Sequence, residues 1–137
     1  MFARRVSSCW SRHAGPEVFA TYAALRQLGR SGIADLVDRC CLLARRFADQ
    51  LSSIDGVTVV NDVVLNQVLV QFGDDERTDL VVDAVQQSGE CWMGGTTWHG
   101  RRLMRISVSN WSTAEADVDR SVAAIERCWS QATIGRS

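Results

Sequence analysis

The chain of 137 residues contains no lysine, because all 15 of its basic residues are arginine. No side chain of this polypeptide can therefore form a Schiff base or serve as the lysine of a phosphate-binding loop. No apolar run approaches the roughly 18 residues of a membrane span, so we expect no membrane insertion. The only histidines, His13 and His99, are too few and too isolated to suggest a catalytic triad.

The charge of the chain is nearly balanced, with 15 basic and 16 acidic residues and a formal net charge of −1. Nucleic-acid binding requires a concentrated basic surface, so we expect no nucleic-acid partner. Hydrophobic residues make up 46% of the chain. A chain of this length and composition predicts one globular domain with a substantial core.

The cysteines have no disulfide framework, since their number is odd and their spacing is irregular. We find nothing that resembles a secretion signal, and therefore expect a reducing, cytoplasmic compartment in which most of them act as small hydrophobic residues. A zinc site needs paired ligands, and the only close pair consists of adjacent residues that diverge on a helix. The five are Cys9, Cys40, Cys41, Cys91 and Cys128.

Residues 1–16 differ from the rest, with arginine and serine, no acid and no clear periodicity. A transit peptide, a disordered tail, or a start codon inside a larger or frame-shifted gene would each give this composition. We favour the last. We therefore divide the chain into an irregular N-terminus, a domain at 17–132 and a tail at 133–137.

Helical periodicity begins near Glu17 and is interrupted by the two glycines of "LGRSG". Apolar residues then keep one helical face from Ile33 to Ile54, and Gly56 is a natural helix terminus. Two strands follow, at 57–60 and 65–72, the second with alternating apolar residues.

A third helix should begin after "GDDERTD", whose acidic residues suit a helix N-terminus, and should end at Gly89. Segments 91–98 and 101–110 predict a hairpin closed near His99–Gly100. Ser112 with Glu115 three residues later predicts a capping box that opens the last helix.

The order of helix, two strands, helix, two strands and helix predicts an α+β fold, with a mostly antiparallel sheet covered by helices on one face. In "RRLMRISVSNWST", alternation places Met104 and Ile106 on one face of a strand and Arg105 on the other. Arg105 therefore faces either water or a negatively charged group.

Several segments, in order, resemble the carboxy-terminal part of pyridoxal-phosphate-dependent group II amino-acid decarboxylases, the family of the glutamate and aromatic-amino-acid decarboxylases. They are "ALRQLGRSG", "NDVVLNQVLVQFGDD", "CWMGGTTWHGRRLMRISVSNWST" and "EADVDRSVAAI". The similarity runs from about residue 18 to about residue 129.

The resemblance implies a small domain of a fold-type-I homodimer, whose uncovered sheet face closes over the cofactor cleft. It also implies that Arg105 binds the carboxylate of the amino-acid substrate. The family's cofactor lysine, the acid beside the pyridine nitrogen and the ring-stacking histidine belong to a large domain that is absent here. We therefore expect pyridoxal phosphate in the intact enzyme, no cofactor on this chain alone, and no activity without a homo-oligomeric or cofactor-domain partner.

Other interpretations compete with these. Without the resemblance, Arg105 is more typical of a solvated sheet face, and a free-standing α+β module that binds a small anion or a partner protein remains an alternative. "GGTTWHG" invites a phosphate-loop interpretation, although a hairpin explains its glycines. His99 suits an exposed turn better than a proton donor. We expect Trp92, Trp98 and Trp111 at an interface, and exposure of Leu65, Leu69, Met93 or Leu103 would favour self-association.

Overall fold

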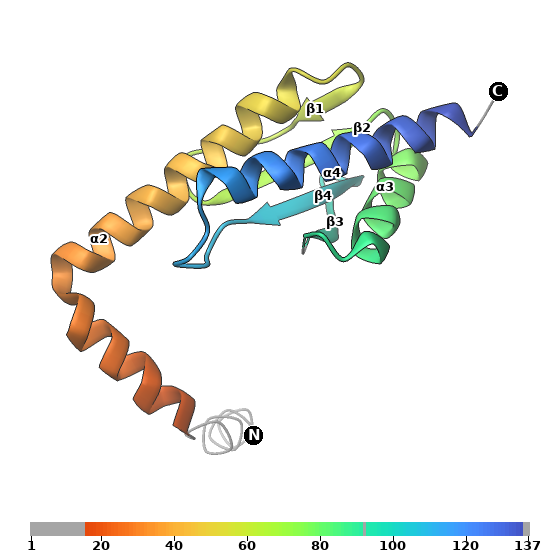
Figure 1. Ribbon diagram of the computed structural model, residues 1–137. Coiled ribbons are helices and arrows are strands. Elements are labelled where there is room, and N and C mark those ends of the chain that lie inside the picture. Colours follow the sequence, from red (N-terminus) through yellow and green to blue (C-terminus); the bar gives the residue numbers. More distant parts are fainter. Residues whose placement is uncertain (1–15, 92, 136–137) are drawn as a thin grey trace, which may run out of the picture. The chain divides into compact units, whose positions relative to one another are not determined.

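The computed structural model describes residues 16–91 and 93–135 (Figure 1). The chain divides into two compact units, with the boundary between Leu36 and Val37. Within the described ranges, no helix combines the length and the apolar character needed to cross a membrane. The predicted irregular segment before the first helix, and Trp92, lie outside the described residues.

The first helix, α2, spans Pro16–Ser52 and is broken at Gly29, whose φ of 65° and ψ of −175° are not helical. The predicted interruption is therefore confirmed at this glycine, whereas Gly32 lies within the helix. Gly29 supplies the positive φ at little steric cost. In the first unit, α2 carries a series of exposed apolar side chains: Val18, Phe19, Tyr22, Leu25 and Leu28.

Four strands form one antiparallel sheet in the order β1-β2-β4-β3. Two further helices complete the second unit, and α3 contacts α4 and strands β2, β3 and β4 (Figure 1). The α+β architecture is as predicted. The elements are β1 (Val57–Val59), β2 (Gln67–Phe72), α3 (Asp75–Ser88), β3 (Gly94–Trp98), β4 (Arg101–Ser107) and α4 (Glu115–Ile134).

The hairpin of β3 and β4 turns at His99 and Gly100, as predicted. Both residues have positive φ, 50° and 75°. Two successive positive φ values are the signature of the tight turn whose twist matches that of paired strands. The glycines of "GGTTWHG" therefore belong to a strand and its turn.

The core lies between the sheet and the helices. Val68 and Val70 of β2 pair across the sheet with Ile106 and Met104 of β4, and all four side chains are buried. The ring of Trp129 on α4 lies 5.9 Å, centroid to centroid, from that of Phe72. Fully burying each such aliphatic side chain contributes roughly 1.5–3 kcal/mol.

A salt bridge joins α4 to the part of α2 in the second unit. Arg46 donates from Nε and Nη2 to the two carboxylate oxygens of Asp119, each at 2.9 Å, and Gln50 donates to the same carboxylate at 2.7 Å. The hydrogen bonds from Arg46 and Gln50 lower the pKa of Asp119 to about 2.

The ends of α3 are as predicted, with Asp74 capping its first turn and Gly89 left-handed after its last. The predicted capping box of α4 is wrong in its residues. The helix begins at Glu115, and the Asp117 carboxylate accepts from the backbone N–H of Ala114 at 2.9 Å. The Ser112 hydroxyl instead donates to Asn110.

Of the four residues whose exposure would favour self-association, two are buried. Leu103 is 1% exposed and Met93 is 5% exposed, whereas Leu65 is 64% exposed and Leu69 is half-buried. Leu103 lies on the Arg105 side of β4, but β4 is a central strand with neighbours on both sides. Alternation assigns a face of the sheet, and cross-strand neighbours decide how far that face is shielded.

Candidate functional site

Arg105 is exposed on the sheet face opposite the helices. Its neighbours Met104 and Ile106 are buried in the core, so alternation directs Arg105 away from it. Within the described residues, no hydrogen bond or ion pair involves the side chain of Arg105. Its placement is the one predicted from the sequence, and its role in binding a substrate stays a prediction.

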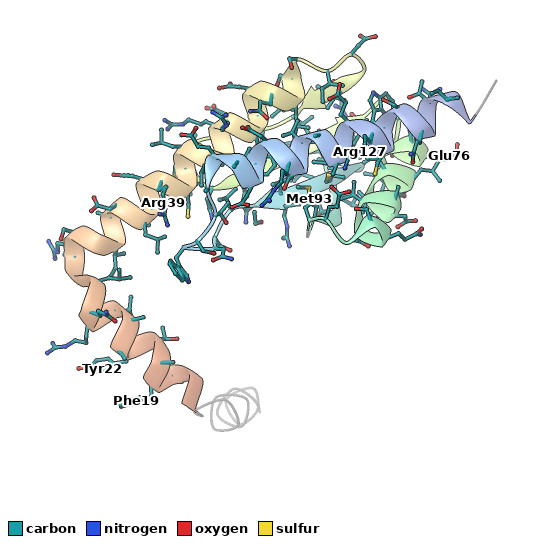
Figure 2. All side chains as sticks on the ribbon, viewed as in Figure 1. Phe19, Tyr22, Arg39, Glu76, Met93 and Arg127 are labelled. Atoms are coloured by element: carbon teal, nitrogen blue, oxygen red, sulfur yellow. The ribbon has the colours of Figure 1, made fainter. Side chains whose placement is uncertain are left out.

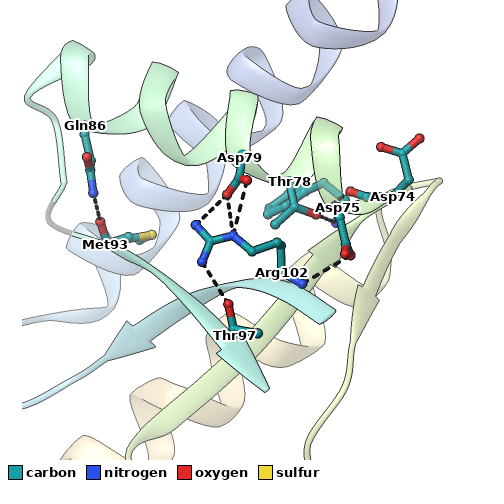
Figure 3. Close-up of polar contacts among 9 residues, drawn as sticks. Asp74, Asp75, Thr78, Asp79, Gln86, Met93, Thr97 and Arg102 are labelled. Atoms are coloured by element: carbon teal, nitrogen blue, oxygen red, sulfur yellow. Dashed lines mark hydrogen bonds and ion pairs between the residues drawn. The ribbon is translucent and has the colours of Figure 1, made fainter. Parts of the chain in front are cut away.

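A second arginine of the same strand, Arg102, differs from Arg105 because its side chain is paired. Arg102 points to the α3 side, where its Nη2 lies 2.7 Å and its Nε 2.9 Å from the Asp79 carboxylate (Figure 3). It also donates from Nη1 to Thr97 at 3.0 Å, and its backbone N–H donates to Asp75. The hydrogen bond to Asp79 raises the pKa of Arg102 further. Arg102 therefore ties α3 to the hairpin, whereas the charge of Arg105 has no such partner.

The cross-strand neighbours of Arg105 are Leu69 on β2 and Gly94 on β3. Directly opposed residues of antiparallel strands point to the same face. A Cβ atom placed on Gly94 would meet nothing within 4 Å. Arg105 therefore has an apolar side chain opposite it on β2 and no side chain opposite it on β3, and Gln67 with Ser107 forms the next pair on this face.

The other residues singled out in the sequence lie on the surface. His99 is exposed at the turn. Its ring lies edge-on to that of Trp98, with 4.2 Å between the ring centroids. Trp98 and Trp111 are 43% and 74% exposed. Arg39 donates to the backbone carbonyl of Trp111. None of these contacts tests the interface predicted for the tryptophans.

Sequence reasoning missed a groove of about 800 Å³ between the end of α2 in the second unit, α3 and α4, lined among others by Arg77, Glu126 and Trp129. The Trp129 indole donates to the Asp55 carbonyl at 3.0 Å. The Arg77 Nε is buried without a hydrogen-bond acceptor among the described residues. Only the fold places Arg77 near Trp129, because the two residues are far apart in the sequence. Arg105 does not line this groove.

Within the described residues, no three histidine, cysteine or acidic side chains are grouped closely enough to hold a metal ion. No protein-family model matches the chain.

Solved structures do match. The chain is similar to rice (Oryza sativa) TDC with PLP and tryptamine, with a TM-score of 0.74 at 16% identity over 80% of this chain and 26% of that one. It is similar to Catharanthus roseus tryptophan decarboxylase in complex with L-tryptophan, with a TM-score of 0.75 at 18% identity over 82% and 25% of the two chains. For mouse CSAD the TM-score is 0.70 at 16% identity, over 79% and 26%.

At these identities the likeness establishes a shared fold. The fold is the one expected from the resemblance to pyridoxal-phosphate-dependent decarboxylases, and the chain spans about a quarter of the length of the structures it matches. Covalent attachment of pyridoxal phosphate requires a lysine amine, and this chain has none. The residues present therefore do not fit this cofactor, and no step of its chemistry can be assigned to them.

Proposed function

We propose that the chain is the substrate-closing portion of a pyridoxal-phosphate-dependent amino-acid decarboxylase. It acts only when joined to, or paired with, a polypeptide that carries the cofactor lysine. The observation that supports this most strongly is the fold likeness to decarboxylase structures that are about four times as long. The absence of lysine also supports this proposal, because the lysine that holds the cofactor must then come from another polypeptide or another part of a longer one.

In this proposal, Arg105 binds the carboxylate of the amino-acid substrate. A planar guanidinium can donate two parallel hydrogen bonds to a carboxylate, which an ammonium group cannot imitate. Arg105 is free of internal partners in the described chain, unlike Arg102. The open space above Gly94 leaves room beside the guanidinium for the bound anion.

The partner in this proposal is either a cofactor-domain chain or the rest of a longer polypeptide within a homo-oligomer. We propose a cytoplasmic compartment, since the described cysteines are unpaired. The exposed apolar side chains of α2, with Phe19 at 76% and Tyr22 at 59% (Figure 2), suit burial against such a partner.

Mass spectrometry of the native product tests this proposal. We would tag the chromosomal gene at its 3′ end, purify the product from its own cells, and measure the intact mass of the species that yields the peptide "ISVSNWSTAEADVDR". We expect either a species far above 15.2 kDa or a complex with a lysine-bearing chain that binds pyridoxal phosphate. An isolated product with the 15.2 kDa mass of this chain plus that of the tag would contradict the proposal.

The second candidate is a free-standing module that binds a small anionic ligand without chemistry. The groove beside Trp129 favours it, because Arg77 provides a cation there whose Nε lies 3.8 Å from the Asp74 carboxylate, too far for a hydrogen bond. Calorimetric titration of the purified chain with inorganic phosphate, L-glutamate and L-tryptophan separates the candidates. Saturable binding lost in Arg77→Ala and kept in Arg105→Ala would favour the module.

A further inference from the structure

In the first unit, helix α2 is broken by a backbone conformation that only glycine adopts readily. Gly29 has a φ of 65° and a ψ of −175°, although the residues on both of its sides are helical. This combination lies in a region of backbone conformations that is essentially restricted to glycine, because a Cβ atom is not tolerated there. The break therefore depends on the identity of residue 29.

A second glycine makes room for the break. A Cβ atom added to Gly32 would lie 3.1 Å from the Cβ atom of Leu28 and 3.4 Å from its Cδ2 atom. In a regular α-helix, the Cβ atoms of residues four apart are separated by about 5–6 Å. The break therefore brings the side chain of Leu28 down onto the backbone of Gly32, where any larger residue would be crowded. Both glycines thus fit the same broken form.

The spacing of the apolar residues fits a continuous form instead. On an unbroken helix with about 100° between successive residues, five apolar residues from both sides of the break would share one face, within an arc of roughly 80°. They are Val18, Tyr22, Leu25, Ile33 and Leu36. A pattern that keeps its phase across the break is what one continuous helix requires, and a permanent break does not need it.

We propose that Gly29 is a hinge at which α2 exchanges between the broken form and one continuous helix. In the broken form, Leu28 packs over Gly32. In the continuous form, the apolar residues before and after Gly29 make a single stripe. Residues 18–31 are all exposed, so the exchange disrupts no buried core. This inference is independent of the proposed function, because it concerns α2 alone.

Double electron–electron resonance on the full chain measures the two forms directly. Spin labels would be attached through p-acetylphenylalanine at Ala20 and Ala34, which are both exposed, so that the cysteines stay unlabelled. At a rise of about 1.5 Å per residue, a continuous helix separates the Cα atoms of these positions by about 21 Å. We expect two distance populations, one near this value and one shorter.

Two glycine variants should each reduce the shorter population. Gly29→Ala should lower the ratio of the shorter to the longer population at least about tenfold, because alanine favours the helix and disfavours the broken backbone. A Cβ atom at position 29 meets nothing within 4 Å, so the variant loses no packing. Gly32→Ala should lower the ratio about fivefold. Gly32 is helical in both forms, so only its contact with Leu28 distinguishes them.

Arg30→Ala is the matched control. Arg30 is exposed and lies next to the hinge, and arginine and alanine have similar helix propensities. The ratio of the two populations should therefore stay within about twofold of that in the unsubstituted chain. A circular dichroism melt of each labelled chain checks that the second unit still unfolds cooperatively.

Three results would overturn the proposal. One is a single distance population in the unsubstituted chain, whether it lies near 21 Å or below. Another is an unchanged population ratio in Gly29→Ala or in Gly32→Ala. The third is an equal fall in the ratio for Arg30→Ala and Gly29→Ala, which would place the flexibility of α2 outside the glycine.

Discussion

Replacing Gly56 by alanine should destabilise the second unit by about 2–4 kcal/mol. Gly56 has a φ of +78°, and its added Cβ would lie 2.8 Å from Cζ2 of Trp129. The left-handed backbone costs a non-glycine residue roughly 1–2 kcal/mol. Overpacking adds about 1–3 kcal/mol. The reduced entropy of the unfolded chain returns about 0.4–1 kcal/mol. The Trp129 ring cannot easily move aside, because its indole N–H donates to the Asp55 carbonyl.

Gly89 provides a matched control. Its φ of +67° is similar, but a Cβ there would meet nothing within 4 Å. Gly89→Ala therefore incurs the backbone cost alone and should lose only about 1 kcal/mol. The difference between the two variants isolates the contact with Trp129.

Urea unfolding followed by far-ultraviolet circular dichroism measures both losses as changes in the free energy of unfolding. We expect Gly56→Ala to lose about 1–3 kcal/mol more than Gly89→Ala. Equal losses within about 0.5 kcal/mol would refute the packing argument. Adding Trp129→Phe, whose ring is smaller, to Gly56→Ala should recover part of the additional loss in the free energy of unfolding.

Three further outcomes are expected. Thr78→Val should cost about 1–3 kcal/mol in urea unfolding, because the buried Thr78 hydroxyl accepts the Phe72 N–H at 3.0 Å and valine leaves that donor unpaired. Asp119→Asn should lower the melting temperature at pH 7, because Asp119 pairs with Arg46. The folded pKa of Asp119 is about 2. The stabilisation is therefore fully present above the unfolded pKa near ~3.9 and is lost progressively as the pH falls through the folded pKa. A melting-temperature gap from wild type that stays constant from pH 7 to pH 2 would contradict this. Arg105→Ala should change the free energy of unfolding by less than about 0.5 kcal/mol, because exposed residues without partners contribute little.

Local sequence signals predicted the elements of the fold well. The turn at His99–Gly100 and the end of α3 at Gly89 follow from glycine's tolerance of positive φ, which is a property of the residue itself. The start of α4 was misassigned because several polar residues near Ser112 satisfy a capping pattern. The backbone selected the Asp117 carboxylate instead.

Contacts between distant segments could not be predicted in the same way. The face of Arg105 followed from alternation, but the burial of Leu103 and Met93 depends on neighbouring strands whose order was unknown. The contrast between Arg102 and Arg105 likewise depends on where α3 packs. The sequence thus identified the residue of interest, and the fold supplied the reason to single it out: its charge has no internal partner in the described chain.

The most direct test of the central claim is the steady-state kinetics of the native product with Arg105 changed to alanine. The matched control is Arg101→Ala, an exposed arginine of the same strand. Carbon dioxide release from L-tryptophan and L-glutamate would be measured with the tagged product loaded with pyridoxal phosphate. Loss of a bidentate charged hydrogen bond of roughly 1.5–3 kcal/mol predicts a fall of about 10- to 100-fold in kcat/KM for Arg105→Ala, and no change for Arg101→Ala. Equal kcat/KM values for the two variants, or no decarboxylation by the wild-type product, would contradict the account.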